Sequence, residues 1–106
     1  ENLTKPQPEF KKILQLTKDF TKKRNMKLYF VYLPEYARYS GKYDNTNYLK
    51  VKKIIEELDI EFIDIPSEVF DKEDDPRQLF PFQLMGHYNS KGYKKVANKI
   101  YEITSR

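Results

Sequence analysis

The feature that most limits how this chain can fold is a nearly continuous apolar and aromatic run over residues 27–33, KLYFVYL. Pro34 follows the run and ends it. A strand with one face in water alternates apolar and polar residues, whereas a strand buried on both faces does not. Aromatic and β-branched residues are also the types that favour strands. The run therefore predicts a strand within a parallel sheet that helices cover on both sides.

A second strand and three amphipathic helices are expected around the first strand. The second strand is predicted over residues 62–65, and Pro66 closes it. The helical patterns run from the Pro6–Pro8 region to about Arg24, over residues 48–58, and from Ser90, as N-cap, to about Thr104. A short additional helix is expected to begin near Ser67. The predicted order is α-β-α-β-α.

Helices and strands that alternate at this spacing predict right-handed crossovers and an α/β fold. Two strands alone have unpaired edges and are too few for independent stability. The 106 residues suffice for one small domain at most. We therefore expect residues 1–106 to form a single α/β unit, the C-terminal portion of a flavodoxin-like, doubly wound parallel sheet with flanking helices.

The charged residues, 34% of the chain with a net charge of +4, are spread unevenly. Residues 11–24 hold six bases and one acid, and residues 61–75 hold seven acids and one base. The lysines fall on the solvated sides of amphipathic helices and no nucleic-acid signature accompanies them, so we expect no nucleic-acid partner. No apolar run approaches the roughly 18–20 residues of a membrane span. The absence of cysteine excludes disulfides and thiolate metal sites and leaves the compartment open.

His87, the only histidine, lies in a turn just before the last predicted helix. A turn exposes the imidazole ring while the following helix fixes its backbone, which suits acid–base chemistry. The alternative is a structural histidine, because a lone titratable group has no visible partner.

The histidine block, HYNSKGY over residues 87–93, and its position after two β-α units resemble the C-terminal section of SGNH (GDSL-type) ester hydrolases. In that family a strand ends in a proline-containing loop, as at Pro34, and a later short strand often reads hydrophobic-x-Asp, as at Phe62-Ile63-Asp64. The catalytic histidine then precedes a terminal helix. The resemblance covers most of the chain.

The resemblance implies that this chain is the histidine-bearing part of a serine ester hydrolase, an esterase or O-acyl deacetylase. His87 would be the general base and then the general acid for a serine upstream of this chain. None of the four serines, Ser40, Ser67, Ser90 and Ser105, lies in the family's nucleophile context. The implied partners are a small-molecule or carbohydrate ester and the remainder of the hydrolase domain. The chain alone is expected to be inactive, and no cofactor is implied.

The group that would orient His87 is left open by the sequence. The family usually has an aspartate three residues before the histidine, but Leu84 occupies that position. A backbone carbonyl can orient the ring instead, as can an acid such as Asp74 or Asp75. The site can also work as a dyad or be degenerate. Among the acids we consider Asp75, which is otherwise a solvated loop acid.

Four further residues are candidates for supporting roles. Tyr36, Arg38 and Tyr39 follow the first predicted strand, at the edge where open α/β sheets bind ligands, so they are candidate substrate-binding residues or a surface loop pinned by its aromatics. Asn89 is expected to hold the histidine turn through local hydrogen bonds. Gly92 is expected to permit the close approach of another segment.

Metal and nucleotide sites are not predicted. One histidine without a second ligand at metal-binding spacing makes no site, and the acids of residues 71–75 lack the glycine of a calcium loop. The three glycines form no phosphate-binding loop. The alternative to a hydrolase is a non-catalytic α/β binding or interaction module in which His87 is structural.

Overall fold

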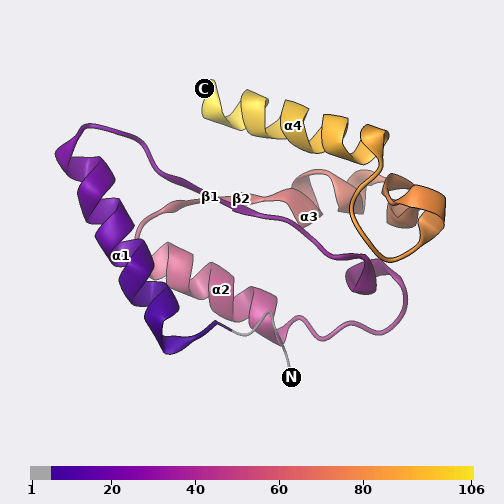
Figure 1. Ribbon diagram of the computed structural model, residues 1–106, viewed down its shortest axis with the longest axis horizontal. Helices are drawn as coiled ribbons and strands as arrows, with labels where there is room; N and C mark the ends of the chain where they lie inside the picture. Colours follow the sequence, from indigo (N-terminus) through magenta and orange to yellow (C-terminus); the bar gives the residue numbers. More distant parts are fainter. Residues whose placement is uncertain (1–5) are drawn as a thin grey trace. The chain divides into compact units, whose positions relative to one another are not determined.

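The computed structural model describes residues 6–106. In chain order the elements are α1 (Pro8–Lys23), β1 (Tyr29–Tyr32), η1 (Tyr36–Tyr39), α2 (Thr46–Glu57), β2 (Glu61–Asp64), α3 (Ile65–Glu68), η2 (Phe70–Lys72), η3 (Pro76–Leu79), η4 (Pro81–Gln83) and α4 (Ser90–Thr104), where η marks a 3-10 helix (Figure 1). The last helix has the bounds that the sequence predicts.

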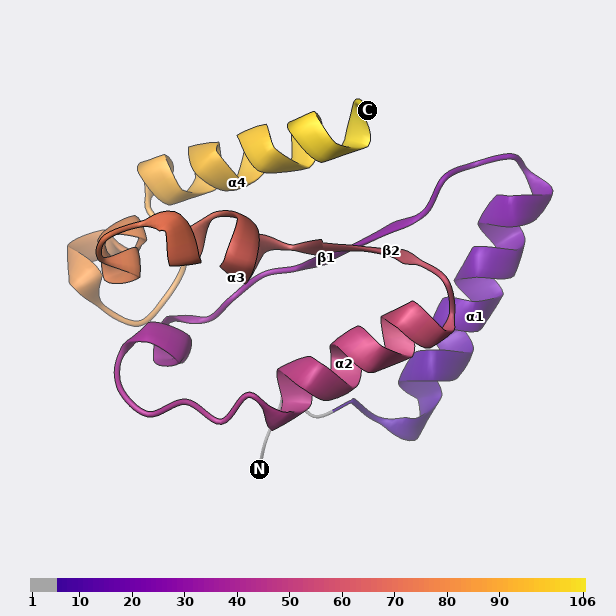
Figure 2. The same cartoon turned by 180° about the vertical axis from the view of Figure 1, so that it is seen from behind.

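The prediction of a flavodoxin-like, doubly wound sheet is wrong. The described residues are 60% helical, and their sheet consists of β1 paired in parallel with β2 (Figure 2). The two expected strands therefore form, but the described residues add no third. Pro66, Pro76 and Pro81 each lie in the first turn of a short helical segment after β2. Proline suits the first turn of a helix and interrupts a strand ladder, which explains why this region folds into short helices.

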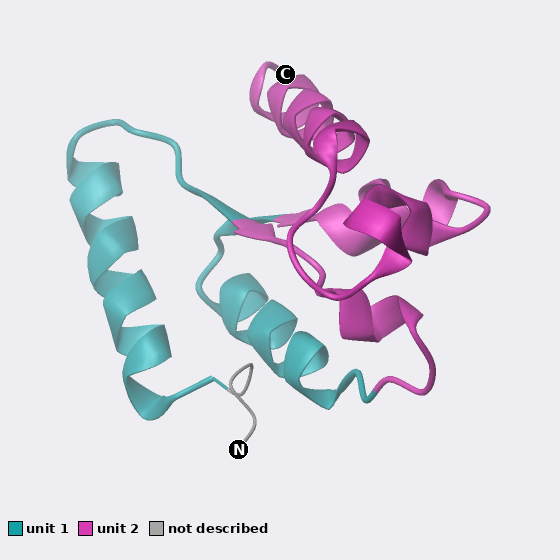
Figure 3. Ribbon diagram, turned by 45° about the vertical axis from the view of Figure 1, so that its right-hand side comes forward, with its two compact units in different colours: residues 1–30, 44–62 teal, residues 31–43, 63–106 magenta. Residues whose placement is uncertain are grey.

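The described chain divides into two compact units, shown in different colours in Figure 3. Unit 1 contains residues 6–30 and 44–62 of the described chain, and unit 2 contains residues 31–43 and 63–106. The division falls within both strands. All six candidate site residues, Tyr36, Arg38, Tyr39, Asp75, His87 and Asn89, belong to unit 2.

Aromatic contacts organise unit 1. Phe30 of β1 stacks on Phe62 of β2 with ring centroids 5.9 Å apart, and Phe10 of α1 meets Phe30 edge-on at 5.9 Å. The inner face of α2 is buried through Val51 and Ile55. The apolar side of α1 is only partly covered, because Ile13, Leu16 and Phe20 are exposed. The β1 residues are likewise half-buried rather than enclosed on both faces.

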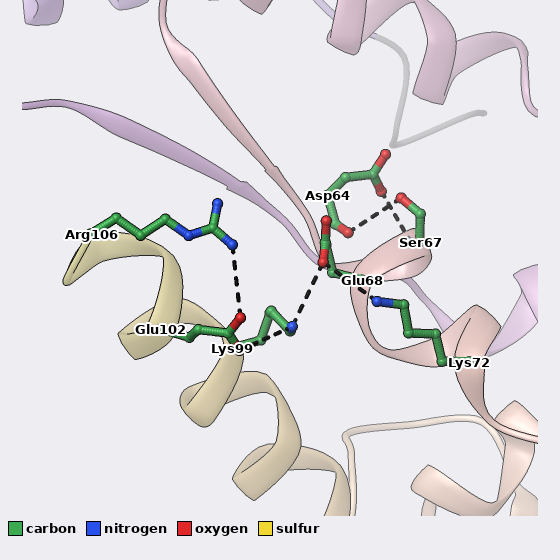
Figure 4. A network of polar contacts seen from close by, with 7 residues as sticks. All are labelled: Asp64, Ser67, Glu68, Lys72, Lys99, Glu102 and Arg106. Atoms are coloured by element: carbon green, nitrogen blue, oxygen red, sulfur yellow. Dashed lines mark hydrogen bonds and ion pairs between the residues drawn. The ribbon is translucent and has the colours of Figure 1, made fainter.

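Unit 2 is built around fully buried apolar side chains, among them Ile63, Ile65, Phe70, Leu79 and Phe80. Helix α4 contacts α3 and η3 and buries Val96 and Ile103. One ion pair joins α3 to α4, with Lys99 3.8 Å from Glu68, and a second lies within α4, with Lys99 3.1 Å from Glu102 (Figure 4). Unit 2 thus holds the start of α4, and with it the histidine, against the short helices.

Candidate functional site

His87 lies in the loop between η4 and α4 with its ring exposed. Its Nδ1 is 2.7 Å from the backbone carbonyl oxygen of Tyr88. A carbonyl oxygen only accepts hydrogen bonds, so Nδ1 carries the proton and donates. In the neutral ring, Nε2 is then the unprotonated nitrogen, and it has no hydrogen-bond partner within residues 6–106. The ring therefore presents a basic nitrogen.

Tyr88 fixes the position of the histidine. Its side chain is buried against Phe70 and Phe80, with ring centroids 5.0 and 5.3 Å away. Its hydroxyl donates to the carbonyl of Pro34 at 2.5 Å. Burial raises the pKa of Tyr88 above its ordinary value, so this hydroxyl stays protonated as a donor. The carbonyl that orients His87 thus belongs to a residue anchored in the core of unit 2.

Asn89 connects the histidine loop to α4 and η3. Its side-chain oxygen accepts from the backbone N–H of Gly92 at 2.9 Å, and its amide nitrogen donates to the carbonyl of Gln78 at 2.8 Å. Asn89 is therefore the N-cap of α4. The prediction that Ser90 is the N-cap is wrong, because Ser90 is the first residue of the helix.

Asp75 binds Arg77. One carboxylate oxygen lies 3.0 Å from Nε and 3.1 Å from the backbone nitrogen of Arg77, and the other lies 3.1 Å from Nη2. The side-chain hydrogen bonds from Arg77 lower the pKa of Asp75. The carboxylate is thus engaged in a bidentate ion pair, while Nδ1 of His87 is bound to a carbonyl.

The tyrosine segment η1 contacts the end of η4, where the histidine loop (residues 84–89) begins. The hydroxyl of Tyr36 donates to the carbonyl of Gln83 at 2.6 Å, and its ring meets Phe80 edge-on at 5.1 Å. Tyr39 instead stacks on Phe70, with centroids 5.5 Å apart. The Arg38 guanidinium lies 5.3 Å from the centroid of the Tyr43 ring. The structure therefore brings Tyr36 to the loop and directs Tyr39 and Arg38 to other neighbours.

The sequence reasoning missed Tyr88 and Tyr93. Tyr93 follows the apolar spacing of α4, yet it is exposed. Its ring lies nearly parallel to that of His87, with centroids 6.4 Å apart and an interplanar angle of 17°. Tyr93 lies six residues after His87, in the first turn of the helix. That spacing could have predicted the contact, because the first turn of a helix lies next to the loop that precedes it.

Within residues 6–106, no group of three or more histidine, cysteine, aspartate or glutamate side chains is arranged to hold a metal ion. The helices of this part of the chain also include none with the length and apolar character needed to cross a membrane.

Comparison with known proteins returns no relative. No protein-family model matches the sequence, and no curated protein or solved structure matches it. The functional argument therefore depends on the residues of the site.

Proposed function

We propose that this chain supplies the catalytic histidine of a serine ester hydrolase of the SGNH (GDSL) type. The observation that carries the proposal is the hydrogen bond from Nδ1 of His87 to the Tyr88 carbonyl, 2.7 Å long, which leaves Nε2 unprotonated on an exposed ring. A histidine that acts as base for a serine needs this tautomer, with its second nitrogen held by an acceptor. The HYNSKGY block supports the same assignment.

In the proposed reaction, Nε2 of His87 takes the proton of a serine hydroxyl while the serine oxygen attacks the ester carbonyl. The resulting imidazolium returns the proton to the leaving alcohol, and a water molecule then releases the acyl group with the same histidine as base. The Tyr88 carbonyl holds the ring orientation throughout. It is a neutral acceptor, so it stabilises the imidazolium through its dipole and less than a carboxylate does.

The nucleophile and the oxyanion donors are proposed to come from outside residues 1–106. The side chains of Ser40 and Ser67 bond to carbonyls of their own turns, those of Ala37 and Asp64. The remainder of the hydrolase domain is thus the necessary partner, and the substrate class is a small-molecule or carbohydrate ester.

The test compares two substitutions of His87 in the protein that contains this chain, with para-nitrophenyl acetate as substrate. His87→Ala removes the base and its hydrogen bond. His87→Asn keeps an N–H that can donate to the Tyr88 carbonyl but has no basic nitrogen. We expect both variants to lose roughly a hundred- to ten-thousandfold in kcat/KM. Added imidazole should restore part of the activity of His87→Ala.

The controls separate catalysis from folding. Asp75→Asn should retain activity, because Asp75 is bound to Arg77 and not to His87. The isolated 106-residue chain should be inactive. Full activity in His87→Asn together with lost activity in His87→Ala would contradict the proposal, since the hydrogen bond alone would then suffice and His87 would be structural.

A further inference from the structure

Three exposed apolar residues lie close together in the chain just before His87, one in η4 and two in the loop that follows it. Phe82, Leu84 and Met85 are 93%, 62% and 79% exposed, and we call them the apolar tip. A single exposed apolar residue is ordinary, but three within four positions of the chain need an explanation. A side chain as exposed as Phe82 does not form the wall of a closed pocket, so the apolar tip requires a partner that surrounds it.

The backbone beneath the apolar tip is strained and firmly held. Phe82 and Gln83 both have φ of 55°, a conformation that bulky residues rarely adopt and that persists only where the surroundings impose it. The backbone carbonyl of Gln83 accepts a hydrogen bond from the Tyr36 hydroxyl at 2.6 Å. The backbone N–H of Gln83 donates to the carbonyl of Phe80 at 3.1 Å. Phe80 itself is fully buried. The apolar tip is therefore presented on a fixed base.

The segment that carries the apolar tip is basic. Residues 82–101 contain four lysines, Lys91, Lys94, Lys95 and Lys99, and no acid. Lys95 pairs with Glu73, and Lys99 pairs with Glu68 and Glu102. Lys91 and Lys94 are exposed and form no ion pair within the described residues. Their positive charge is thus available to an anionic partner.

We propose that the apolar tip inserts into the surface of a lipid layer containing anionic lipids, with Lys91 and Lys94 beside the headgroups. Apolar side chains flanked by lysine are the combination by which proteins bind at a lipid interface without crossing it. A neutral protein pocket would accept the apolar side chains but would leave the two lysines unused. The proposal is independent of ester hydrolysis, because lipid binding is measured without a substrate.

The test is co-sedimentation of the protein with vesicles made of equal parts phosphatidylcholine and phosphatidylglycerol. We expect binding that weakens as salt is added. Phe82→Asn should lower the partition coefficient at least roughly tenfold, since a Phe side chain no longer enters the lipid. Asparagine tolerates positive φ, so this substitution preserves the loop backbone. Lys91→Gln with Lys94→Gln should also weaken binding roughly tenfold.

The matched control is Leu49→Gln, which changes an apolar residue of α2 that is 58% exposed. It should bind the mixed vesicles as the unchanged protein does. Equal binding by Phe82→Asn and the unchanged protein would overturn the proposal. A lack of vesicle binding would also overturn it. If light scattering then detects a dimer that Phe82→Asn abolishes, the apolar tip contacts a second copy of this chain.

Discussion

The hydroxyl of Tyr88 donates a hydrogen bond to the carbonyl oxygen of Pro34, 2.5 Å away, although 54 residues separate them along the chain. Pro34 is buried and lies just beyond β1, whereas Tyr88 directly follows His87. The bond therefore ties the histidine loop to the segment that leaves the sheet. It also fixes the residue whose carbonyl orients His87.

Tyr88→Phe removes this bond and keeps the buried ring. We expect the free energy of unfolding to fall by about 1–2 kcal/mol, because the Pro34 carbonyl is left buried without that donor. Urea denaturation measures the change. Tyr101→Phe, at an exposed tyrosine, is the control and should have almost no effect. An unchanged midpoint in Tyr88→Phe would show that water replaces the donor.

Tyr39→Phe should have the opposite effect. The Tyr39 hydroxyl is buried and has no hydrogen-bond partner within the described part of the chain, while its ring stacks on Phe70. A buried polar group without a partner costs free energy, so its removal should raise the free energy of unfolding by up to about 1 kcal/mol. The same urea titration tests this. A loss of stability would mean that the hydroxyl binds a partner, such as an ordered water.

Alkaline pH should destabilise unit 2. Burial raises the pKa of both Tyr39 and Tyr88 above that of an ordinary tyrosine. Below a pH of about 10 both tyrosines are protonated in the folded and in the unfolded chain, so the free energy of unfolding is at its full value. As pH rises further, the unfolded chain ionises first, so stability falls. Urea midpoints on either side of this pH measure the loss, and Tyr39→Phe should reduce it. A midpoint independent of pH would contradict the prediction.

The strands and the last helix could be predicted because each depends on a local pattern. The run KLYFVYL marks β1, and the apolar spacing after Ser90 marks α4. The prediction of a doubly wound sheet was wrong because it assumed further strands beyond the two that the sequence indicates. The residues after β2 pack through aromatic rings, such as Phe70 on Tyr39 and on Tyr88, which lie far apart in the chain and follow no period that a sequence reveals.

The sequence predicts which residues form the candidate site better than it predicts which atoms they contact. The position of His87 before a helix could be read from the sequence, but the acceptor for Nδ1 is a backbone carbonyl, which every residue carries. Only the backbone conformation determines which carbonyl faces the ring. Arg77 lies two residues after Asp75 and binds its carboxylate. That spacing in the sequence could have predicted that Asp75 pairs with Arg77 and not with His87.

The ion pairs of Lys99, one to Glu68 of α3 and one within α4 to Glu102, give a prediction that depends on salt. Lys99 is largely buried between Glu68 and Glu102. Lys99→Met keeps the apolar stem and removes the charge, so we expect a loss of about 1 kcal/mol at low salt. The loss should shrink when salt is added, because salt screens the pairs. Lys94→Met, at an exposed lysine, is the control. A loss that does not change with salt would indicate packing, not charge.

Gly92 is the position where a single added methyl group should disturb the site. A Cβ built there lies 2.7 Å from the carbonyl oxygen of Leu79 and 3.0 Å from Cβ of Tyr88, which confirms that the missing side chain permits a close approach. Alanine gains about 1 kcal/mol over glycine in helix propensity, but overpacking costs about 1–3 kcal/mol. We therefore expect Gly92→Ala to lower the free energy of unfolding by up to about 2 kcal/mol.

The matched control for this substitution is Gly41→Ala, because a Cβ at Gly41 would meet no atom within 4 Å. It should change the urea midpoint little. Gly92→Ala should also displace Tyr88 and so shift the NMR signals of the His87 ring, whereas Gly41→Ala should leave them unchanged. If Gly92→Ala is as stable as the unchanged protein, helix propensity outweighs the contact, and η3 has room to move away from α4 without loss of the histidine's support.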